Sequence, residues 1–179
     1  MVEPGKSRGW IGRGLIFLAV FTSLQIGWQA WGGTRIRWLV VHDGTVCPAV
    51  ELVNWLTPAV HARAVGFSLV APGGGLNILN GCEGTEALFM LAGAFVIAPI
   101  PRRARAAGFV LGIPLVFAAN EARILSLFYA FRADPALFDT LHGTVTPILM
   151  VAVITLYFYA WTLPSSSPRG VDTQMANAG

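Results

Sequence analysis

Four long apolar stretches dominate the pattern of hydrophobic and polar positions along this chain. They cover residues 15–31, 82–100, 106–131 and 144–163. Each approaches or exceeds the ~20 residues that an α-helix needs to cross the hydrocarbon core of a bilayer. An open sheet would leave backbone groups unpaired in lipid, so each stretch is interpreted as a helix. The pattern predicts an all-α integral membrane protein, built as a bundle of four transmembrane helices.

The composition supports a membrane environment. Of the 179 residues, 55% are hydrophobic and only 12% are charged, which is about half the charged share of a soluble domain. The formal net charge of +3 reflects where the loops lie and does not indicate a nucleic-acid partner. We predict one polytopic domain over residues 1–163, in contact with the lipid bilayer. Residues 164–179 lack apolar periodicity and are predicted to form a disordered cytoplasmic tail.

Basic residues near the ends of the apolar stretches orient the predicted bundle. One cluster precedes the first stretch and another fills the turn between the second and the third: Lys6, Arg8 and Arg13, and Arg102, Arg103 and Arg105. Such clusters are retained in the cytoplasm. Both can be cytoplasmic only if both termini are inside, which places the loops 32–81 and 132–141 outside. The first stretch also has features of a signal peptide, but no clean small-x-small cleavage site follows it.

The long outer loop carries its own structural signals. Residues 48–56 have apolar positions at helical spacing and end at a Thr-Pro pair, which predicts a short interfacial helix. Residues 65–70 and 76–79 are predicted to form the two strands of a β-hairpin, joined by a Gly- and Pro-rich turn. Two interpretations of this hairpin stay open: an edge that pairs with an extended peptide, or a cap that covers the bundle.

Cys82 stands where the outer loop becomes the second apolar stretch. A helix N-terminus favours the thiolate, because its free N–H groups and positive dipole end lower the pKa of a thiol. Glu83 and Glu86 act in the opposite direction, so activation of the sulfur requires a nearby cation. The alternative is a disulfide with Cys47, the other cysteine of the chain. Spacing alone leaves nucleophile and disulfide equally open.

Arg123 lies inside an otherwise apolar stretch, where a charge is energetically unfavourable and by default marks a functional site. The stretch ends at Phe131, which places Arg123 roughly 12 Å below the outer edge of the membrane. Its long side chain reaches back toward the level of Cys82 and Glu86. Asn120 shares its helix face and is predicted to support it. The alternative is a structural ion pair, for which Glu86 is a better partner than the adjacent Glu121.

His142 is predicted to open the fourth apolar stretch, again at the outer surface and at the depth of Cys82. A lone histidine at a helix start is more often a cap, and the match in depth favours a functional role. His42 and His61 lie in the outer loop without such a match. No pair of His or Cys residues has the spacing of metal ligands, so no metal site is predicted.

The ordered set of these residues resembles the archaeosortase/exosortase family of membrane transpeptidases. The resemblance covers about residues 80–161 and rests on four features: Cys82 within Gly-Cys-Glu-Gly, the basic turn after its helix, Asn120-x-x-Arg123-Ile124, and His142 before the last span. Residues 123–129 and the short chain are similar to the short bacterial exosortases of the H or M type.

The resemblance implies a cysteine-dependent transpeptidase or protease that works through an acyl-enzyme intermediate and needs no cofactor. It makes Cys82 the nucleophile and Arg123 and His142 its catalytic partners. The implied substrates are exported proteins that end in a short motif, a transmembrane helix and a basic tail. The implied location is the inner membrane of a bacterium, with the site facing the periplasm or exterior.

A non-enzymatic interpretation also fits the sequence. In it the protein is a membrane scaffold or a transporter subunit. A buried network of Glu86, Glu121 and Arg123 would hold the bundle together, and Cys47 would form a disulfide with Cys82.

Overall fold

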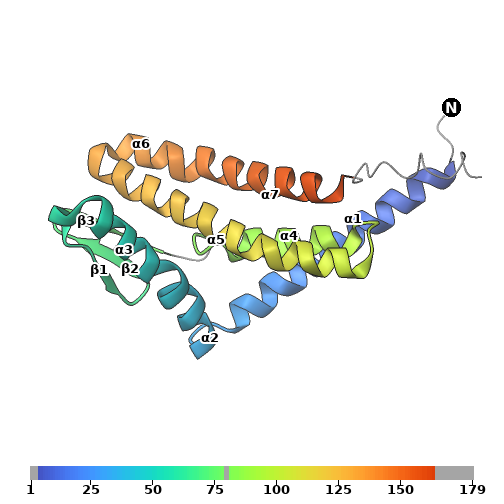
Figure 1. Cartoon of the computed structure of the whole chain (residues 1–179), viewed down its shortest axis with the longest axis horizontal. Helices are drawn as coiled ribbons and strands as arrows, with labels where there is room; N and C mark the ends of the chain where they lie inside the picture. The colour runs from blue at the N-terminus through green and yellow to red at the C-terminus, as the bar shows by residue number, and fades with distance from the viewer. Residues whose placement is uncertain (1–3, 79–80, 164–179) are drawn as a thin grey trace, which may run out of the picture.

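The computed structural model describes residues 4–78 and 81–163; the predicted tail 164–179 lies outside these residues. The molecule is elongated, and its long helices run roughly along one axis (Figure 1). The bundle consists of α1 (Pro4–Ala30), α4 (Thr85–Ile97), α5 (Arg102–Ala133), α6 (Pro135–Thr140), η3 (Leu141–Val145) and α7 (Thr146–Thr162).

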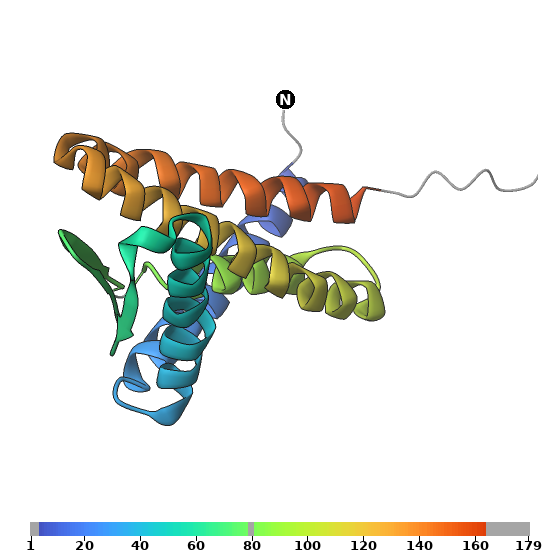
Figure 2. The same cartoon turned by 60° about the vertical axis from the view of Figure 1, so that its left-hand side comes forward.

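A smaller unit, here called the loop subdomain (residues 35–78), is inserted between α1 and α4. It consists of α2 (Arg35–Trp38), η1 (Leu39–Val46), α3 (Cys47–Leu56), η2 (Pro58–Val60), β1 (Arg63–Val65), β2 (Ser68–Ala71) and β3 (Gly74–Asn77). Figure 2 shows α3 lying against α5, and the hydroxyl groups of Thr57 and Tyr129 hydrogen-bond there at 2.8 Å. The helix predicted at residues 48–56 is confirmed as α3.

Among the described residues, three helices are long and apolar enough to cross a membrane: Gly9–Ala30, Arg102–Ala133 and Pro135–Thr162. The second predicted stretch forms only the 13-residue helix α4, which is shorter than the ~20 residues of a full crossing. The reason is local. A turn with Gly81 and Gly84 in the left-handed region precedes Thr85, and Pro99 and Pro101 follow the helix, where proline prevents its continuation.

The prediction of an outer loop at residues 132–141 is wrong, because most of these residues are helical. α5 continues to Ala133, a single residue follows, and α6 begins at Pro135. Asp134 is the N-cap, and its Oδ1 accepts a hydrogen bond from Ala136 N at 2.9 Å. A capping aspartate followed by proline at the first helical position is a strong helix start. The fourth helix therefore begins at Pro135 rather than at residue 144, and His142 lies within it.

The β-structure differs from the predicted hairpin in the number of strands. The sheet has three antiparallel strands in the order β1-β2-β3, with Val65 opposite Ser68 and Ala71 opposite Gly74. The predicted first strand is divided by a turn at Gly66, which adopts φ +57°. Glycine adopts this left-handed conformation without steric cost, so the chain reverses there.

Two hydrophobic cores join these units. The loop subdomain packs its buried residues against α5 in a core that includes Val41, Val46, Leu69, Ile124 and Phe128. The bundle has a second core of Ala87, Leu91, Phe95, Val116, Met150 and Ile154. α5 takes part in both cores and therefore fixes the loop subdomain relative to the bundle.

Close approach of α5 to its neighbours depends on a residue without a side chain. A Cβ added at Gly108 would lie 2.6 Å from Phe95 Cζ and 2.6 Å from Trp161 Nε1. The Trp161 Nε1–H donates to Ala104 O at 2.9 Å, so that ring is fixed in place. Small residues at such positions allow membrane helices to pack closely.

Gly108→Ala is therefore expected to destabilise the protein by about 1–3 kcal/mol, because the added methyl group overlaps two aromatic rings. Thermal unfolding in detergent micelles measures the effect. Gly14→Ala is the matched control, since no described atom lies within 4 Å of a Cβ added there. Equal unfolding temperatures for the two variants would contradict this account of the packing.

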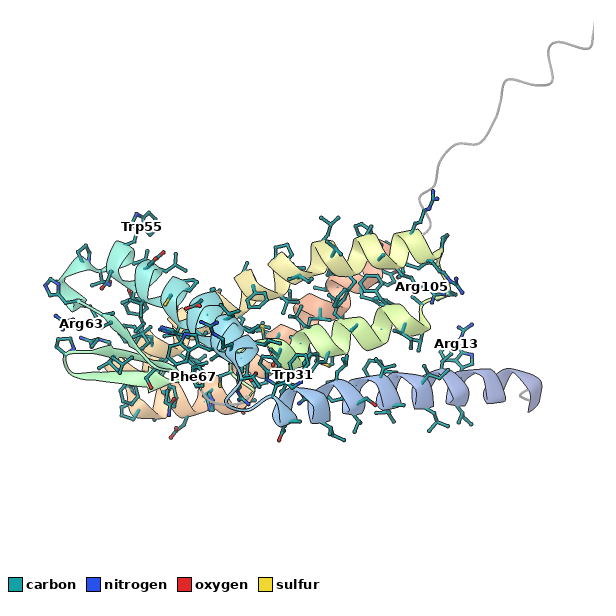
Figure 3. The ribbon with its side chains drawn as sticks, turned by 90° about the horizontal axis from the view of Figure 1, so that it is seen from below. Arg13, Trp31, Trp55, Arg63, Phe67 and Arg105 are labelled. Carbon is teal, nitrogen blue, oxygen red and sulfur yellow. The ribbon has the colours of Figure 1, made fainter. Side chains whose placement is uncertain are left out.

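The basic ends of the helices share one end of the molecule. Arg13 of α1 and Arg105 near the start of α5 lie at the same end, whereas Trp55 and Arg63 of the loop subdomain lie at the opposite end (Figure 3). This arrangement is what an alternating set of membrane helices requires, because both basic clusters must then face the same compartment.

Candidate active site

Cys82 lies in a tight turn between the sheet and α4. Gly84 is the N-cap of α4 and adopts φ +80°. A Cβ at this position would lie 3.0 Å from Asn120 Cγ. Asn120 of α5 is fully buried, and its Nδ2 donates a hydrogen bond to Cys82 O at 3.0 Å. Asn120 therefore holds the backbone of the cysteine, not the side chain of Arg123 as the sequence suggested.

His142 faces the thiol from the fourth helix. Its Nε2 lies 3.5 Å from Cys82 Sγ, and its ring stacks on Phe138 with centroids 5.3 Å apart and an angle of 7° between the planes. His142 belongs to the π-helical turn η3. Such turns are rare and occur frequently at functional sites, because the extra residue redirects side chains.

Arg123 approaches the same sulfur from α5. Its Nη2 lies 3.8 Å from Cys82 Sγ, its Nη1 donates to Gly81 O at 3.0 Å, and its Nε donates to Thr146 Oγ1 at 3.1 Å. The Thr146 hydroxyl in turn donates to Leu141 O at 3.0 Å. The planar guanidinium is thereby fixed by partners on two other segments, which a flexible lysine would not achieve.

Glu86 does not pair with Arg123 in the part of the chain that the structure describes. Its exposed carboxylate accepts a hydrogen bond from Gln25 Nε2 at 3.1 Å. The salt bridge that the alternative interpretation placed between Glu86 and Arg123 is therefore absent there, and the guanidinium binds a carbonyl and a hydroxyl group instead.

Helix lengths give the depth of the site. At 1.5 Å per residue, Arg123 lies about 32 Å along α5 from Arg102, and His142 lies about 30 Å along its helix from Thr162. The hydrocarbon core is about 30 Å thick, so both residues lie about one membrane thickness from the opposite end of the bundle. α5 ends at Ala133, so Arg123 lies about 15 Å along the helix from its far end, where α5 packs on the loop subdomain.

The surroundings of Cys82 raise the pKa of its thiol. Burial is the largest cause, Arg123 acts in the opposite direction, and Glu83 and Glu86 raise the pKa further. The cation that the sequence required is thus present, but burial outweighs it. At neutral pH the sulfur is a thiol, and an adjacent base must remove its proton before it can attack.

Glu83 joins the turn of residues 81–84, here called the Cys82 turn, to α1 and α2, a link that the sequence did not indicate. The side chain is 1% exposed, and its Oε1 accepts a hydrogen bond from Trp28 Nε1 at 2.8 Å. Arg37 Nη2 lies 3.9 Å from the same oxygen, and the Arg37 guanidinium stacks over the Trp28 ring. A carboxylate so deeply buried must be paired, and this network fixes the residue next to Cys82.

Thr146 and Phe138 also belong to the site but were not predicted as site residues, although their spacing from His142 in the sequence indicates them. Both lie four residues from His142, and residues at this spacing share a helix face. A helix starting at Asp134-Pro135 would have placed all three on one face. The helix was instead predicted from residue 144, so Phe138 was assigned to a loop.

Cys47 and Cys82 are both free thiols in the described structure. Cys47 Sγ instead lies 3.8 Å from His42 Nδ1 on the loop subdomain. The disulfide of the non-enzymatic interpretation is therefore absent between these two residues.

Two hollows flank Arg123. The one between α4 and α7 has a volume of about 150 Å³, and the one between α5 and α7 about 370 Å³. The first is lined by Gly81, Gly84, Glu86, Ala87, Met90, Arg123, Pro147, Met150 and Val151. The second is lined by Ala119, Ala122, Arg123, Ser126, Thr146, Leu149, Met150 and Val153. Arg123 thus lines both hollows, together with Glu86 in the first and with Ser126 and Thr146 in the second; the other lining residues are apolar or glycine.

The raised pKa of Cys82 has a measurable consequence. In a Cys47→Ala background, alkylation of Cys82 by iodoacetamide is expected to accelerate steadily with pH, with a midpoint above the thiol's ordinary value of ~8.5. Arg123→Gln removes the influence that lowers the pKa and is expected to shift the midpoint upward. Glu86→Gln removes one that raises it and is expected to shift the midpoint slightly downward.

A rate that is already constant below pH 7 would show a preformed thiolate and would contradict this description of Cys82. A shift in the same direction for Arg123→Gln and Glu86→Gln would contradict the assigned electrostatics. Intact mass measured at each pH reports the alkylated fraction.

Comparison with known proteins assigns the chain to a family. The model of the family described as Transmembrane exosortase (Exosortase_EpsH) matches residues 44–159, well over half of the chain. The match includes Cys82, Arg123 and His142. No curated protein and no solved structure matches the chain. The resemblance seen in the sequence is confirmed: the chain belongs to the transmembrane exosortase family.

Proposed function

We propose that this protein is a cysteine-dependent membrane transpeptidase or protease that cleaves the C-terminal sorting signals of exported proteins. Family membership indicates a membrane transpeptidase that acts on exported proteins with sorting signals. One observation carries the assignment of the site. Cys82 Sγ lies 3.5 Å from a base, His142 Nε2, and 3.8 Å from a permanent cation, Arg123 Nη2.

In the first half of the reaction, His142 Nε2 takes the proton from the Cys82 thiol. The thiolate then attacks the carbonyl carbon of the scissile peptide bond and forms a tetrahedral intermediate. When this intermediate collapses, the C–N bond breaks and the imidazolium gives its proton to the leaving amine. The N-terminal part of the substrate stays attached to Cys82 as a thioester.

In the second half, an acceptor nucleophile attacks the thioester and releases the product. Water gives hydrolysis and an amine gives transpeptidation, and in both cases His142 removes the proton of the attacking group. Arg123 stabilises the negative oxygen that develops in both halves. Its bonds to Gly81 O and Thr146 Oγ1 keep the guanidinium in place before the charge appears, which is the requirement for electrostatic catalysis.

The proposed membrane arrangement has four crossings and both termini in the cytoplasm of a bacterium. Helices α1, α5 and the continuous α6–α7 helix cross fully. α4 rises only about 20 Å, so the remaining depth is covered by the residues that flank it, by tilt or by local thinning of the bilayer. The site then faces the periplasm or exterior, one membrane thickness from the basic ends at Arg13 and Arg105.

The hollow between α5 and α7 suits the membrane anchor of a substrate. Its lining is almost entirely apolar except for Arg123, Ser126 and Thr146. A substrate helix packed there would place the motif that precedes the helix near Arg123 and Cys82, which lie 3.8 Å apart. A basic tail on the cytoplasmic side of that helix would fix its depth in the same way as the protein's own arginines.

The scaffold interpretation has no supporting observation. Its disulfide is absent because both cysteines are free. Its Glu–Arg network is absent as well, because Arg123 binds Gly81 O and Thr146 Oγ1 and Glu86 binds Gln25. The two carboxylate oxygens of Glu121 have no hydrogen-bond partner among the described residues.

Processing of a matched reporter tests the proposed function. The reporter is an exported protein of the host cell that ends in a short motif, an apolar helix and arginines. We expect co-expression with the chain to shorten it at its C-terminus, with loss of the helix and tail. Deleting only the arginines should reduce this shortening. A reporter that stays full length with well-expressed enzyme would count against the proposal, as would cleavage on the cytoplasmic side.

A further inference from the structure

A second cluster of reactive side chains lies on the loop subdomain, apart from Cys82. His42 Nδ1 and Nε2 lie 3.8 and 4.0 Å from Cys47 Sγ, and His42 Nε2 lies 4.0 Å from Asp43 Oδ1. One donor atom from each of the three residues lies within 4.8 Å of the other two. An imidazole, a thiol and a carboxylate thus converge on one point.

The backbone of η1 creates this cluster. On an α-helix, residues five apart point about 140° away from one another, so the spacing of His42 and Cys47 does not indicate a pair of ligands. η1 is instead a π-helix, and Cys47 N–H donates to His42 O five residues earlier. The wider turn brings the two side chains onto the same face. π-Helical turns persist mainly where function requires them.

We propose that His42, Asp43 and Cys47 form a binding site for a divalent transition-metal ion, Zn²⁺ above all. Thiolate, imidazole and carboxylate are the ligand types that zinc takes in proteins. With Zn–S of about 2.3 Å and Zn–N of about 2.0 Å, a tetrahedral site separates sulfur and nitrogen by about 3.5 Å. The observed 3.8 Å is within a small rotation of that value. The site therefore forms by side-chain adjustment alone.

The surroundings favour a site that is ordered on one side and open on the other. The Trp38 ring packs edge-on against the His42 ring at 4.3 Å and limits its rotation. The opposite face of η1 is fixed by Val41 and Val46, which are buried in the core shared with α5. The side chains of His42 and Asp43 are 18% and 50% exposed. An ion can enter from solvent, and its fourth position stays open to water.

Such an ion would stabilise the segment that supports the Cys82 turn. Arg37 immediately precedes Trp38, and its guanidinium lies 3.9 Å from Glu83, the residue after Cys82. An ion bound by His42 and Cys47 spans the π-turn and resists its conversion to an ordinary helix, which would change the position of α2. The site is thus a structural one, distinct from the thiol of Cys82 and independent of the proposed reaction.

Metal binding is tested on the full-length chain in detergent, purified without a histidine tag and carrying Cys82→Ala so that Cys47 is the single thiol. Co²⁺ is the first probe, because a cobalt–thiolate bond gives a charge-transfer absorption that reports the sulfur directly. We expect one Co²⁺ per chain with this absorption, displaced by Zn²⁺. Cys47→Ser should abolish the absorption, and His42→Ala and Asp43→Asn should weaken binding.

His61→Ala is the matched control, since His61 also lies in the loop subdomain but outside the cluster, and it should leave binding unchanged. A second readout guards against misfolded variants: added Zn²⁺ should raise the unfolding temperature of the parent and of His61→Ala, but not of Cys47→Ser, because an ion that binds only the folded state stabilises it. No thiolate absorption, or binding that survives both His42→Ala and Cys47→Ser, would overturn the proposal.

Discussion

Cys82→Ala is expected to leave the reporter entirely full length while the amount of enzyme in the membrane stays the same. Alanine removes the nucleophile but keeps the turn, whose hydrogen bond to Asn120 uses the backbone carbonyl of residue 82. Cys47 cannot replace it, because its sulfur faces His42 on the loop subdomain. Immunoblots of the reporter and of the enzyme measure both quantities.

Cys47→Ala is the matched control and should process the reporter normally. Shortening of the reporter by the Cys82→Ala variant would remove Cys82 from the mechanism. Loss of processing in both variants would instead show that processing also depends on Cys47, and would leave the nucleophilic role of Cys82 without support.

Arg123→Gln is expected to slow single-turnover cleavage by ~10²–10³-fold at saturating substrate, the usual effect of removing a group that stabilises an oxyanion. Arg123→Lys keeps the charge but cannot contact Gly81 O, Thr146 Oγ1 and Cys82 Sγ together. We therefore expect the lysine variant to lie between wild type and Arg123→Gln. Substrate affinity should change much less than the rate.

The exposed Arg103 at the opposite end of α5 provides the control. Arg103→Gln should retain the wild-type rate, which separates the effect of position from the loss of one positive charge. A rate for Arg123→Gln within a few-fold of wild type would show that the guanidinium is structural and would leave His142 as the single catalytic partner.

The sequence could predict most of the helices and the group of reactive residues at one end of the bundle. Apolar stretches of fixed length must alternate across a bilayer, so their ends fall into two sets. Cys82, Arg123 and His142 belong to the same set, and the structure brings them together. This conclusion needs only helix length and loop charge, and it holds although two of the helix boundaries were wrong.

The contacts around these residues could not be predicted, for two physical reasons. First, π-helical turns at η1 and η3 shift side chains away from α-helical spacing. No residue pattern in the sequence predicts such turns. Second, Glu83 meets Trp28 across 55 positions of sequence, and such pairings depend on how α1 packs against the Cys82 turn. The start of α6 could have been predicted from the sequence, because Asp134-Pro135 is a capping signal that outweighs the polar residues after it.

The most direct test of the central claim is the mass of the enzyme caught during a single turnover. Purified protein in detergent is mixed with an excess of the reporter, quenched in acid within one turnover and digested. We predict that the peptide containing Cys82 carries the new C-terminal segment of the reporter as a thioester that hydroxylamine releases, and that Cys82→Ala lacks it. A shortened reporter without this adduct, or with the adduct on another residue, would contradict the account.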